Sequence, residues 1–178
     1  VVWKEAVLKT SQRFMLVGAL LVLVADQVTK YLVASNLPPG GTWSSLPGPW
    51  PLFQIVHAYN TGAAFGLFKN FGVVFMVVAI VVIGAILFYA RSLPASQQLI
   101  GTALGLMLGG SLGNLIDRLR LGQVLDFIDI GIGTTRWYTS NIADASIVLG
   151  VILLGISMLR EEHRPKPATP GSPELPSA

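Results

Sequence analysis

Residues 71–90 read FGVVFMVVAIVVIGAILFYA, a run without a charged side chain. About 20 apolar residues in an α-helix are enough to cross the hydrocarbon core of a bilayer. Three further stretches have comparable length and apolar character, and they run from about Phe14 to Ala34, from Gln98 to Ile116 and from Ile142 to Leu159. We therefore expect an all-α membrane protein built as a bundle of four transmembrane helices.

The composition agrees with a membrane protein. The chain has 178 residues, of which 52% are hydrophobic and 12% charged, whereas soluble domains carry about 25% charged residues. The absence of cysteine excludes disulfides and thiolate chemistry. His57 and His163 lie far apart, so no histidine-held zinc site is expected. The basic residues are dispersed, so no nucleic-acid partner is expected either.

The basic residues predict how the bundle sits in the membrane, because cytoplasmic loops are enriched in lysine and arginine. The side of the bundle that holds both termini carries seven basic residues, and the other side carries four. We therefore predict cytoplasmic termini, with a cytoplasmic segment at 1–13, a membrane domain at 14–160 and a disordered cytoplasmic tail at 161–178. The seven are Lys4, Lys9, Arg13, Arg91, Arg160, Arg164 and Lys166, and the four are Lys69, Arg118, Arg120 and Arg136.

Two longer segments then face outward. The first, about 35–70, begins with proline and glycine turn signals and continues into the β-prone run Phe53–Tyr59. It predicts a small β-rich extracytoplasmic segment between the first and second helices. The second segment, about 117–141, is polar and is expected to be a loop. Aromatic residues of the first segment are expected at the membrane interface, and they are Trp43, Trp50, Phe53 and Phe65.

Five aspartates lie within or beside these apolar segments, where a carboxylate is costly unless it has a partner or a task. Asp26 and Lys30 are four residues apart in the first span, which suits an internal ion pair, and a ligand contact is equally compatible. A glycine at every fourth position of the third span predicts close helix packing. These glycines are Gly101, Gly105, Gly109 and Gly113.

The remaining aspartates follow the third span. Asp117 precedes Arg118, so it is either part of a structural charge pair or a catalytic acid. Asp126 lies among large apolar neighbours, and burial there would raise its pKa. Asn141 is a good helix N-cap, which would place Asp144 in the first turn, where the helix dipole favours a carboxylate. Two carboxyl groups in opposed environments suit general acid–base chemistry.

Five motifs in this order resemble those of the bacterial lipoprotein signal peptidases, or signal peptidase II, and the resemblance covers about Arg13 to Leu159. The motifs are Asp26-Gln27-Val28-Thr29-Lys30, Asn60-Thr61-Gly62-Ala63-Ala64-Phe65, Gly113-Asn114-Leu115-Ile116-Asp117-Arg118, Val124-Leu125-Asp126-Phe127 and Asn141-Ile142-Ala143-Asp144.

The resemblance implies a monomeric aspartic endopeptidase of the bacterial inner membrane, with its site at the outer face and without a metal or cofactor. It would cut diacylglyceryl-modified prolipoproteins just before the lipidated cysteine. Its catalytic pair would be Asp126 and Asp144, with Asp117 as the next candidate. Ser140 departs from the family, in which an aromatic residue often precedes the asparagine. The expected substrate-binding residues are Asp26, Lys30, Asn60, Asn114, Arg118 and Asn141.

Two other functions use intramembrane carboxylates. A small proton-coupled transporter would place its acids near the midplane, often in repeated halves. A membrane scaffold would use the glycines for packing and the acids as caps. The acids of this chain gather toward one side, and its sequence has no internal repeat. The context of Asp126 also has no explanation in a scaffold.

Overall fold

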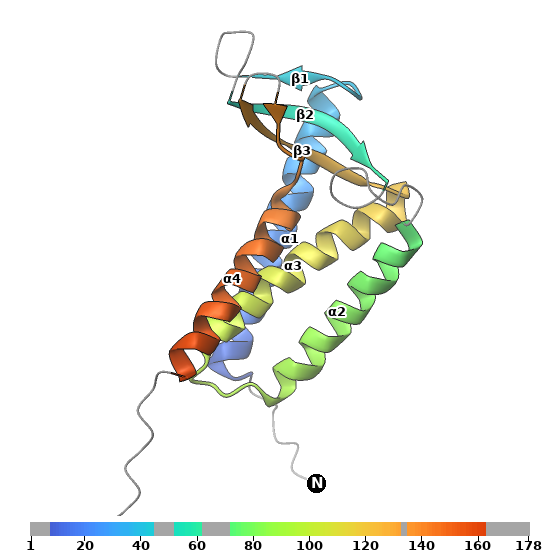
Figure 1. Cartoon of the computed structure of the whole chain (residues 1–178). Coiled ribbons are helices and arrows are strands. Elements are labelled where there is room, and N and C mark those ends of the chain that lie inside the picture. The colour runs from blue at the N-terminus through green and yellow to red at the C-terminus, as the bar shows by residue number, and fades with distance from the viewer. Residues whose placement is uncertain (1–7, 45–51, 62–71, 133–134, 163–178) are drawn as a thin grey trace, which may run out of the picture.

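The computed structural model describes residues 8–44, 52–61, 72–132 and 135–162. Within these residues it contains four helices long and apolar enough to cross a membrane, which confirms the predicted four-helix bundle (Figure 1). Several predictions fall on residues outside this range, namely Trp50, Phe65, His163, the glycine-rich part of the motif after Thr61 and the tail from residue 163 on. Residues 161–162, which were expected in the disordered tail, instead belong to the last helix. The helices are α1 (Thr10–Asn36), α2 (Gly72–Ser92), α3 (Gln98–Leu121) and α4 (Ile142–Glu162).

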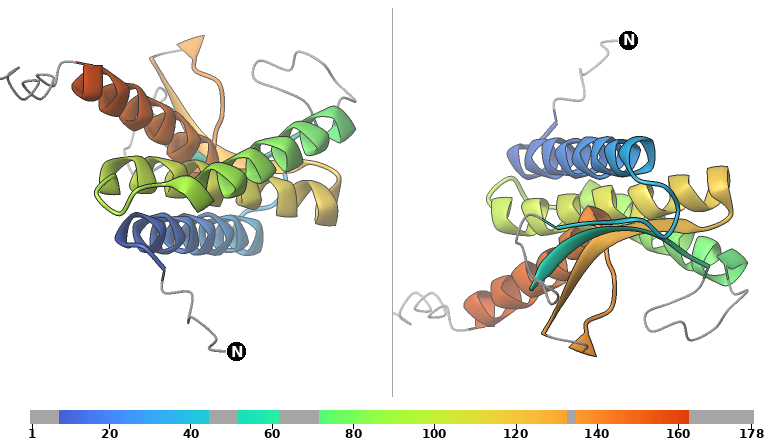
Figure 2. Two further views of the ribbon diagram at one scale, coloured as in Figure 1. Left: turned by 90° about the horizontal axis from the view of Figure 1, so that it is seen from below. Right: turned by 90° about the horizontal axis from the view of Figure 1, so that it is seen from above.

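The glycine-rich helix α3 is the centre of the bundle. It packs most extensively against α1 and α4, which lie on either side of it (Figure 2). A Cβ atom added to Gly105 would lie 2.5 Å from the backbone oxygen of Met15, and one added to Gly109 would lie 2.6 Å from that of Ala19. The predicted packing role of these glycines is therefore confirmed, because only a helix without side chains along this stripe can approach α1 so closely.

A four-stranded antiparallel sheet covers one end of the bundle (Figure 1). The prediction of a β-rich segment between the first two helices was incomplete, because the second outer segment supplies half of the sheet. A lone hairpin is at best marginally stable, so the strands of the first segment need this partner. The strands are β1 (Thr42–Trp43), β2 (Phe53–Asn60), β3 (Val124–Ile132) and β4 (Thr135–Arg136), in the spatial order β1-β2-β3-β4.

Helix α3 is longer than predicted, since it continues past Ile116 to Leu121. Gly122 ends it in the left-handed conformation, with φ of 70°, and its N–H donates to the backbone oxygen of Arg118. Asp117 and Arg118 are therefore helical residues, and the outer segment expected from about Asp117 begins about one turn later. The extra turn carries α3 up to the underside of the sheet.

The sheet rests on the helix ends through a small apolar cluster. Val33 near the end of α1 packs with Leu125 and Phe127 of β3. The end of α1, the start of α2, the end of α3 and the start of α4 all lie at this end of the molecule (Figure 1). Polar residues from helices and strands are thereby brought into one region.

Candidate active site

The start of α4 is fixed by two side chains. The Oδ1 of Asn141 accepts the backbone N–H of Asp144 at 2.9 Å, which confirms the predicted N-cap and places Asp144 at the third helical position. The Oδ1 of Asp26 accepts the backbone N–H of Ala143 at 3.0 Å. Both bonds satisfy N–H groups that have no partner within the helix. They also fix the first turn of α4, from which the side chain of Asp144 projects.

Asp126 comes from a strand rather than from the loop expected from the sequence. It lies on β3 opposite Ala58 of β2, is fully buried and receives three hydrogen bonds from neutral groups. The Nδ2 of Asn141 donates to its Oδ1 at 2.7 Å, and the Nδ2 of Asn60 donates to its Oδ2 at 2.9 Å. The hydroxyl of Tyr138 donates to the same Oδ2 at 3.3 Å.

Asn114 of α3 connects the two aspartates. Its Nδ2 donates to the Oδ1 of Asp144 at 2.7 Å, and its Oδ1 accepts the Nδ2 of Asn141 at 3.2 Å. Asn141 in turn binds Asp126, so the two carboxyl groups belong to one network joined by two amides. Among the residues that the structure describes, no hydrogen bond is made to the Oδ2 of Asp144, which leaves this oxygen for a ligand.

A second cluster, the Lys30 cluster, consists of Asp26, Gln27, Lys30 and Asp117. The Nζ of Lys30 lies 2.8 Å from the Oδ2 of Asp26 and 2.8 Å from the Oδ2 of Asp117. Gln27 donates to Asp117 at 3.0 Å. The prediction of an internal Asp26–Lys30 pair is confirmed. The suggested charge pair of Asp117 with Arg118 was wrong, because Asp117 forms its ion pair with Lys30 instead.

The Lys30 cluster is hydrogen-bonded to residues of the network that joins Asp126 and Asp144. The Nζ of Lys30 donates to the Oδ1 of Asn114 at 3.2 Å, and the Oδ2 of Asp117 accepts the backbone N–H of Leu125 at 3.3 Å. Lys30 is only 5% exposed and Asp26 is fully buried. Neither side chain lines the cavity above, and their predicted contact with substrate stays a prediction.

A cavity of about 700 Å³ opens over the two aspartates. Its polar end contains the predicted site residues Asn60, Asn114, Arg118, Asp126 and Asp144. Its other walls are apolar and follow α4 for more than two turns. The cavity therefore has two aspartates at one end and continues as an apolar groove along α4. The apolar lining includes Phe75, Val124, Trp137, Ile147, Val148, Leu149 and Ile152.

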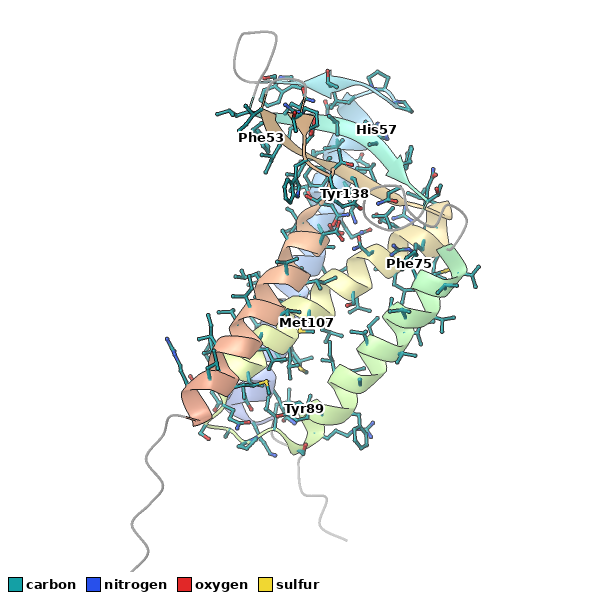
Figure 3. All side chains as sticks on the ribbon, in the orientation of Figure 1. Phe53, His57, Phe75, Tyr89, Met107 and Tyr138 are labelled. Atoms are coloured by element: carbon teal, nitrogen blue, oxygen red, sulfur yellow. The ribbon has the colours of Figure 1, made fainter. Side chains whose placement is uncertain are left out.

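Among the described residues that line the cavity, Arg118 is the cation. Its guanidinium lies 5.6 Å from the ring centroid of Phe75, and its Nη1 donates to the backbone oxygen of Asn114 at 3.3 Å. Phe75 lies near the start of α2, and Tyr138 lies where the sheet meets α4 (Figure 3). The guanidinium attracts both Asp126 and Asp144 electrostatically without forming a direct ion pair with either.

The surroundings of Asp126 disfavour its ionised form. Burial and then the neighbouring Asp144 raise the pKa of Asp126 to about 7, although hydrogen bonds from Asn60 and Asn141 and the charge of Lys30 act in the opposite direction. This agrees with the direction predicted from its apolar neighbours. The same burial raises the pKa of Tyr138, so its hydroxyl stays protonated and can donate.

The fifth aspartate, Asp129, lies outside the cavity. Its Oδ2 is 3.0 Å from the Nη2 of Arg136, and it also accepts a hydrogen bond from Gln54 on β2. Arg136 on β4 therefore has an acidic partner on β3. The pair holds β4 against β3 and places the backbone that leads to Trp137 and Tyr138.

Sequence reasoning missed Tyr138, together with Trp137 and Phe75 of the cavity wall. None of the three belongs to the motifs, and the contact of Tyr138 with Asp126 depends on the return of the chain from β4 to α4. Within the described ranges, the structure brings together no group of three or more histidine, cysteine, aspartate or glutamate residues able to hold a metal ion.

Comparison with known proteins places this arrangement in a family. Residues 18–160 match the family profile described as signal peptidase (SPase) II. The lipoprotein signal peptidase of Moorella thermoacetica is 47% identical over 136 residues, which are 76% of this chain and 86% of that protein. The lipoprotein signal peptidase of Bacillus subtilis is 41% identical over 148 residues, covering 83% of this chain and 94% of that protein.

Solved structures share the fold of this chain. One, described as a bacterial membrane enzyme, superimposes with a TM-score of 0.76 at 31% identity and covers 89% of this chain and 94% of that one. The family match does not support the transporter alternative, and the acids gather at one end of the bundle. The chain belongs to the signal peptidase II family of aspartic-type membrane peptidases.

Proposed function

We propose that this enzyme removes signal peptides from diacylglyceryl-modified prolipoproteins, with Asp126 and Asp144 as its catalytic pair. The observation that carries the proposal is the amide network in which Asn141 binds Asp126 and Asn114 binds Asp144 at the polar end of one cavity. Two carboxyl groups held in this way can share one proton, because both ionise only at high cost. One ionised and one protonated carboxyl group are what aspartic proteolysis requires.

The mechanism follows from the environments of the two acids. We assign the shared proton to Asp126, because burial and the neighbouring Asp144 raise its pKa to about 7. The base is assigned to Asp144, because it lies in the first turn of α4, where the helix dipole favours a carboxylate. Asp144 takes a proton from a water molecule, whose oxygen attacks the scissile carbonyl carbon, while Asp126 donates its proton to the carbonyl oxygen. The tetrahedral intermediate then loses the amine, which receives the proton from Asp144, and Asp126 recovers its own proton from the new carboxyl group.

The cavity walls fit a substrate with an apolar segment and a lipid. The signal peptide and the acyl chains would follow the apolar wall formed by Val148, Leu149 and Ile152 of α4. Asn60 and Arg118, at the polar end, would bind the substrate backbone beside the scissile bond. Cleavage just before the lipidated cysteine would place the acyl chains in the groove and the scissile carbonyl beside Asp144.

We further propose that both termini are cytoplasmic and that the site lies at the outer face of the inner membrane. The excess of basic residues on the side of the termini supports this orientation. Among the predicted substrate-binding residues, Asp26 and Lys30 would act indirectly, because they are buried beneath Asn114. Membrane lipids surround the bundle, and all proposed site residues come from one copy of the chain, so a monomer suffices.

The test is cleavage of a synthetic prolipoprotein peptide by the purified enzyme, with the peptide prepared in diacylated and unacylated forms. We expect the wild type to cut the diacylated peptide before the cysteine and the unacylated peptide far more slowly. Asp126→Asn and Asp144→Asn should each lose activity while keeping the thermal unfolding of a folded bundle. Retained cleavage in either folded variant would remove that residue from the catalytic pair.

A further inference from the structure

Tyr138 is a described residue outside the sequence motifs that contacts the hydrogen-bond network of Asp126 and Asp144. Its hydroxyl accepts a hydrogen bond from the Nδ2 of Asn60 and donates to the Oδ2 of Asp126 at 3.3 Å. Asn60 also donates directly to the same oxygen at 2.9 Å. The phenol, the amide and the carboxylate therefore form a closed triangle in the cavity wall.

This geometry gives each partner its only consistent hydrogen-bonding role within the triangle. An amide nitrogen can only donate, so the phenol oxygen is the acceptor toward Asn60 and its proton is directed to Asp126. The ring of Tyr138 is held between the end of β4 and the start of α4, and it lines the cavity. The hydroxyl is thus aimed at one oxygen of Asp126 and leaves the other to Asn141.

We propose that Tyr138 is a positioning residue that fixes the orientation of the Asp126 carboxyl group and favours its ionised form, an inference that rests on the proposed catalytic role of Asp126. A donor to a carboxylate stabilises the charge, so it opposes burial and the neighbouring Asp144. Tyr138 would thereby keep Asp126 able to lose and regain its proton during each turnover. A carboxylic acid that held its proton too tightly would be a poor donor to the substrate.

Charged groups on three other elements also act on Asp126, so the effect of Tyr138 has to be separated from theirs. Asp144 on α4 repels its charge, while Lys30 on α1 and Arg118 on α3 attract it. None of these groups is altered when the hydroxyl alone is removed. The Tyr138→Phe variant is therefore a clean test, because it keeps the ring that fills the wall.

The experiment is the pH dependence of kcat for the diacylated peptide, measured with wild type, Tyr138→Phe and the matched control Tyr59→Phe. Tyr59 lies on β2 next to Asn60, but neighbouring strand residues point to opposite faces, and its ring instead contacts His57 with centroids 5.0 Å apart. For Tyr138→Phe we expect kcat to fall about threefold to tenfold, as for loss of one hydrogen bond. KM should change little.

The direction of the pH shift distinguishes positioning from a structural role. Without the donor the proton is held more tightly, so the alkaline limb of the profile should move to higher pH by about half a unit. Replacing Tyr138 by a monofluorinated tyrosine, whose phenol is a stronger donor, should move the same limb to lower pH. Tyr59→Phe should leave both kcat and the limb unchanged.

Two results would overturn the inference. One is a Tyr138→Phe profile that superimposes on that of the wild type, and the other is a lower kcat with an unmoved alkaline limb in both Tyr138 variants. Both are judged with Asp126→Asn and Asp144→Asn measured alongside. If those two variants keep activity, the proposed function fails; if they are inactive while Tyr138→Phe is normal, only the role of Tyr138 fails.

Discussion

The two groups of aspartates in this protein have different partners. Asp26 and Asp117 share Lys30, and Asp129 is paired with Arg136, so each of these three has a cation within 3.0 Å. Asp126 and Asp144 receive hydrogen bonds from amides and a phenol, and no cation forms an ion pair with either among the described residues.

The difference in partners separates the aspartates with a structural role from the two that can take part in the reaction. A buried carboxylate that forms an ion pair with its own cation orders the groups around it. A buried carboxylate with only neutral donors keeps a pKa closer to neutral pH, as for Asp126, and can exchange its proton. The cation-paired aspartates hold helices and strands in place. Asp126 and Asp144, which are bound by amides, remain available for the reaction.

The largest effect is expected from a comparison of Asp126→Asn with Asp129→Asn. Both changes remove one buried carboxylate from β3, three residues apart. The first should lower kcat/KM by about 10³-fold or more, since it removes an acid–base group. The second should change it by no more than about threefold, because the partner Arg136 is partly exposed.

Cleavage of the diacylated peptide measures both variants, with thermal unfolding as the control for folding. A loss of similar size in Asp129→Asn would mean that the cation-paired aspartates also take part in the chemistry. The separation into two groups would then be wrong.

Removing the shared cation should have the next largest effect, on stability. Lys30→Met leaves the carboxylates of Asp26 and Asp117 buried without a positive charge, which costs about 3–5 kcal/mol. Denaturant unfolding in detergent micelles should show this loss, and adding Asp117→Asn should recover part of it. If Lys30→Met unfolds at the same denaturant concentration as the wild type, the Lys30 cluster does not carry the structural role given to it.

Adding a methyl group on α3 beside the Lys30 cluster should reduce the stability by a smaller amount. A Cβ atom at Gly113 would lie 2.5 Å from the Oδ2 of Asp26, so Gly113→Ala must displace that carboxylate from Lys30. We expect a destabilisation of about 1–3 kcal/mol. Gly155→Ala on α4 is the matched control, because its Cβ would meet no atom within 4 Å and its stability should be unchanged or slightly higher. Equal stability of the two variants would contradict the tight packing of α3 on α1.

The smallest predicted effect is on the pH dependence of the free energy of unfolding. Because the folded protein raises the pKa of Asp126 from 3.8 to about 7, its protonated form is favoured in the fold. The resulting stability is complete below pH 4 and is lost as the pH rises through about 7. Asp126→Asn has no proton to lose, so its stability relative to the wild type should rise by about 1–2 kcal/mol between pH 6 and pH 8. Melting curves at both values measure this, and a constant difference would contradict the raised pKa.

The network also shows why part of the site was predictable. The helix N-cap at Asn141 and the Asp26–Lys30 pair depend on neighbours three or four residues away, so the sequence pattern contains them. The bond of Asn114 to Lys30 joins residues 84 positions apart, and that of Tyr138 to Asp126 needs the strand pairing. No local pattern encodes such contacts.

The sequence by itself determined the four spans, their glycine-lined contact and the concentration of acids toward one side, because hydropathy and helical periodicity are properties of neighbouring residues. Only the tertiary structure decided which acids obtain a cation. The pairing of β2 with β3 places Asp126 where the amide of Asn60 donates to it, and the extra turn of α3 places Asp117 beside Lys30. Charge pairing between distant segments depends on distances of a few ångströms, and packing alone fixes those.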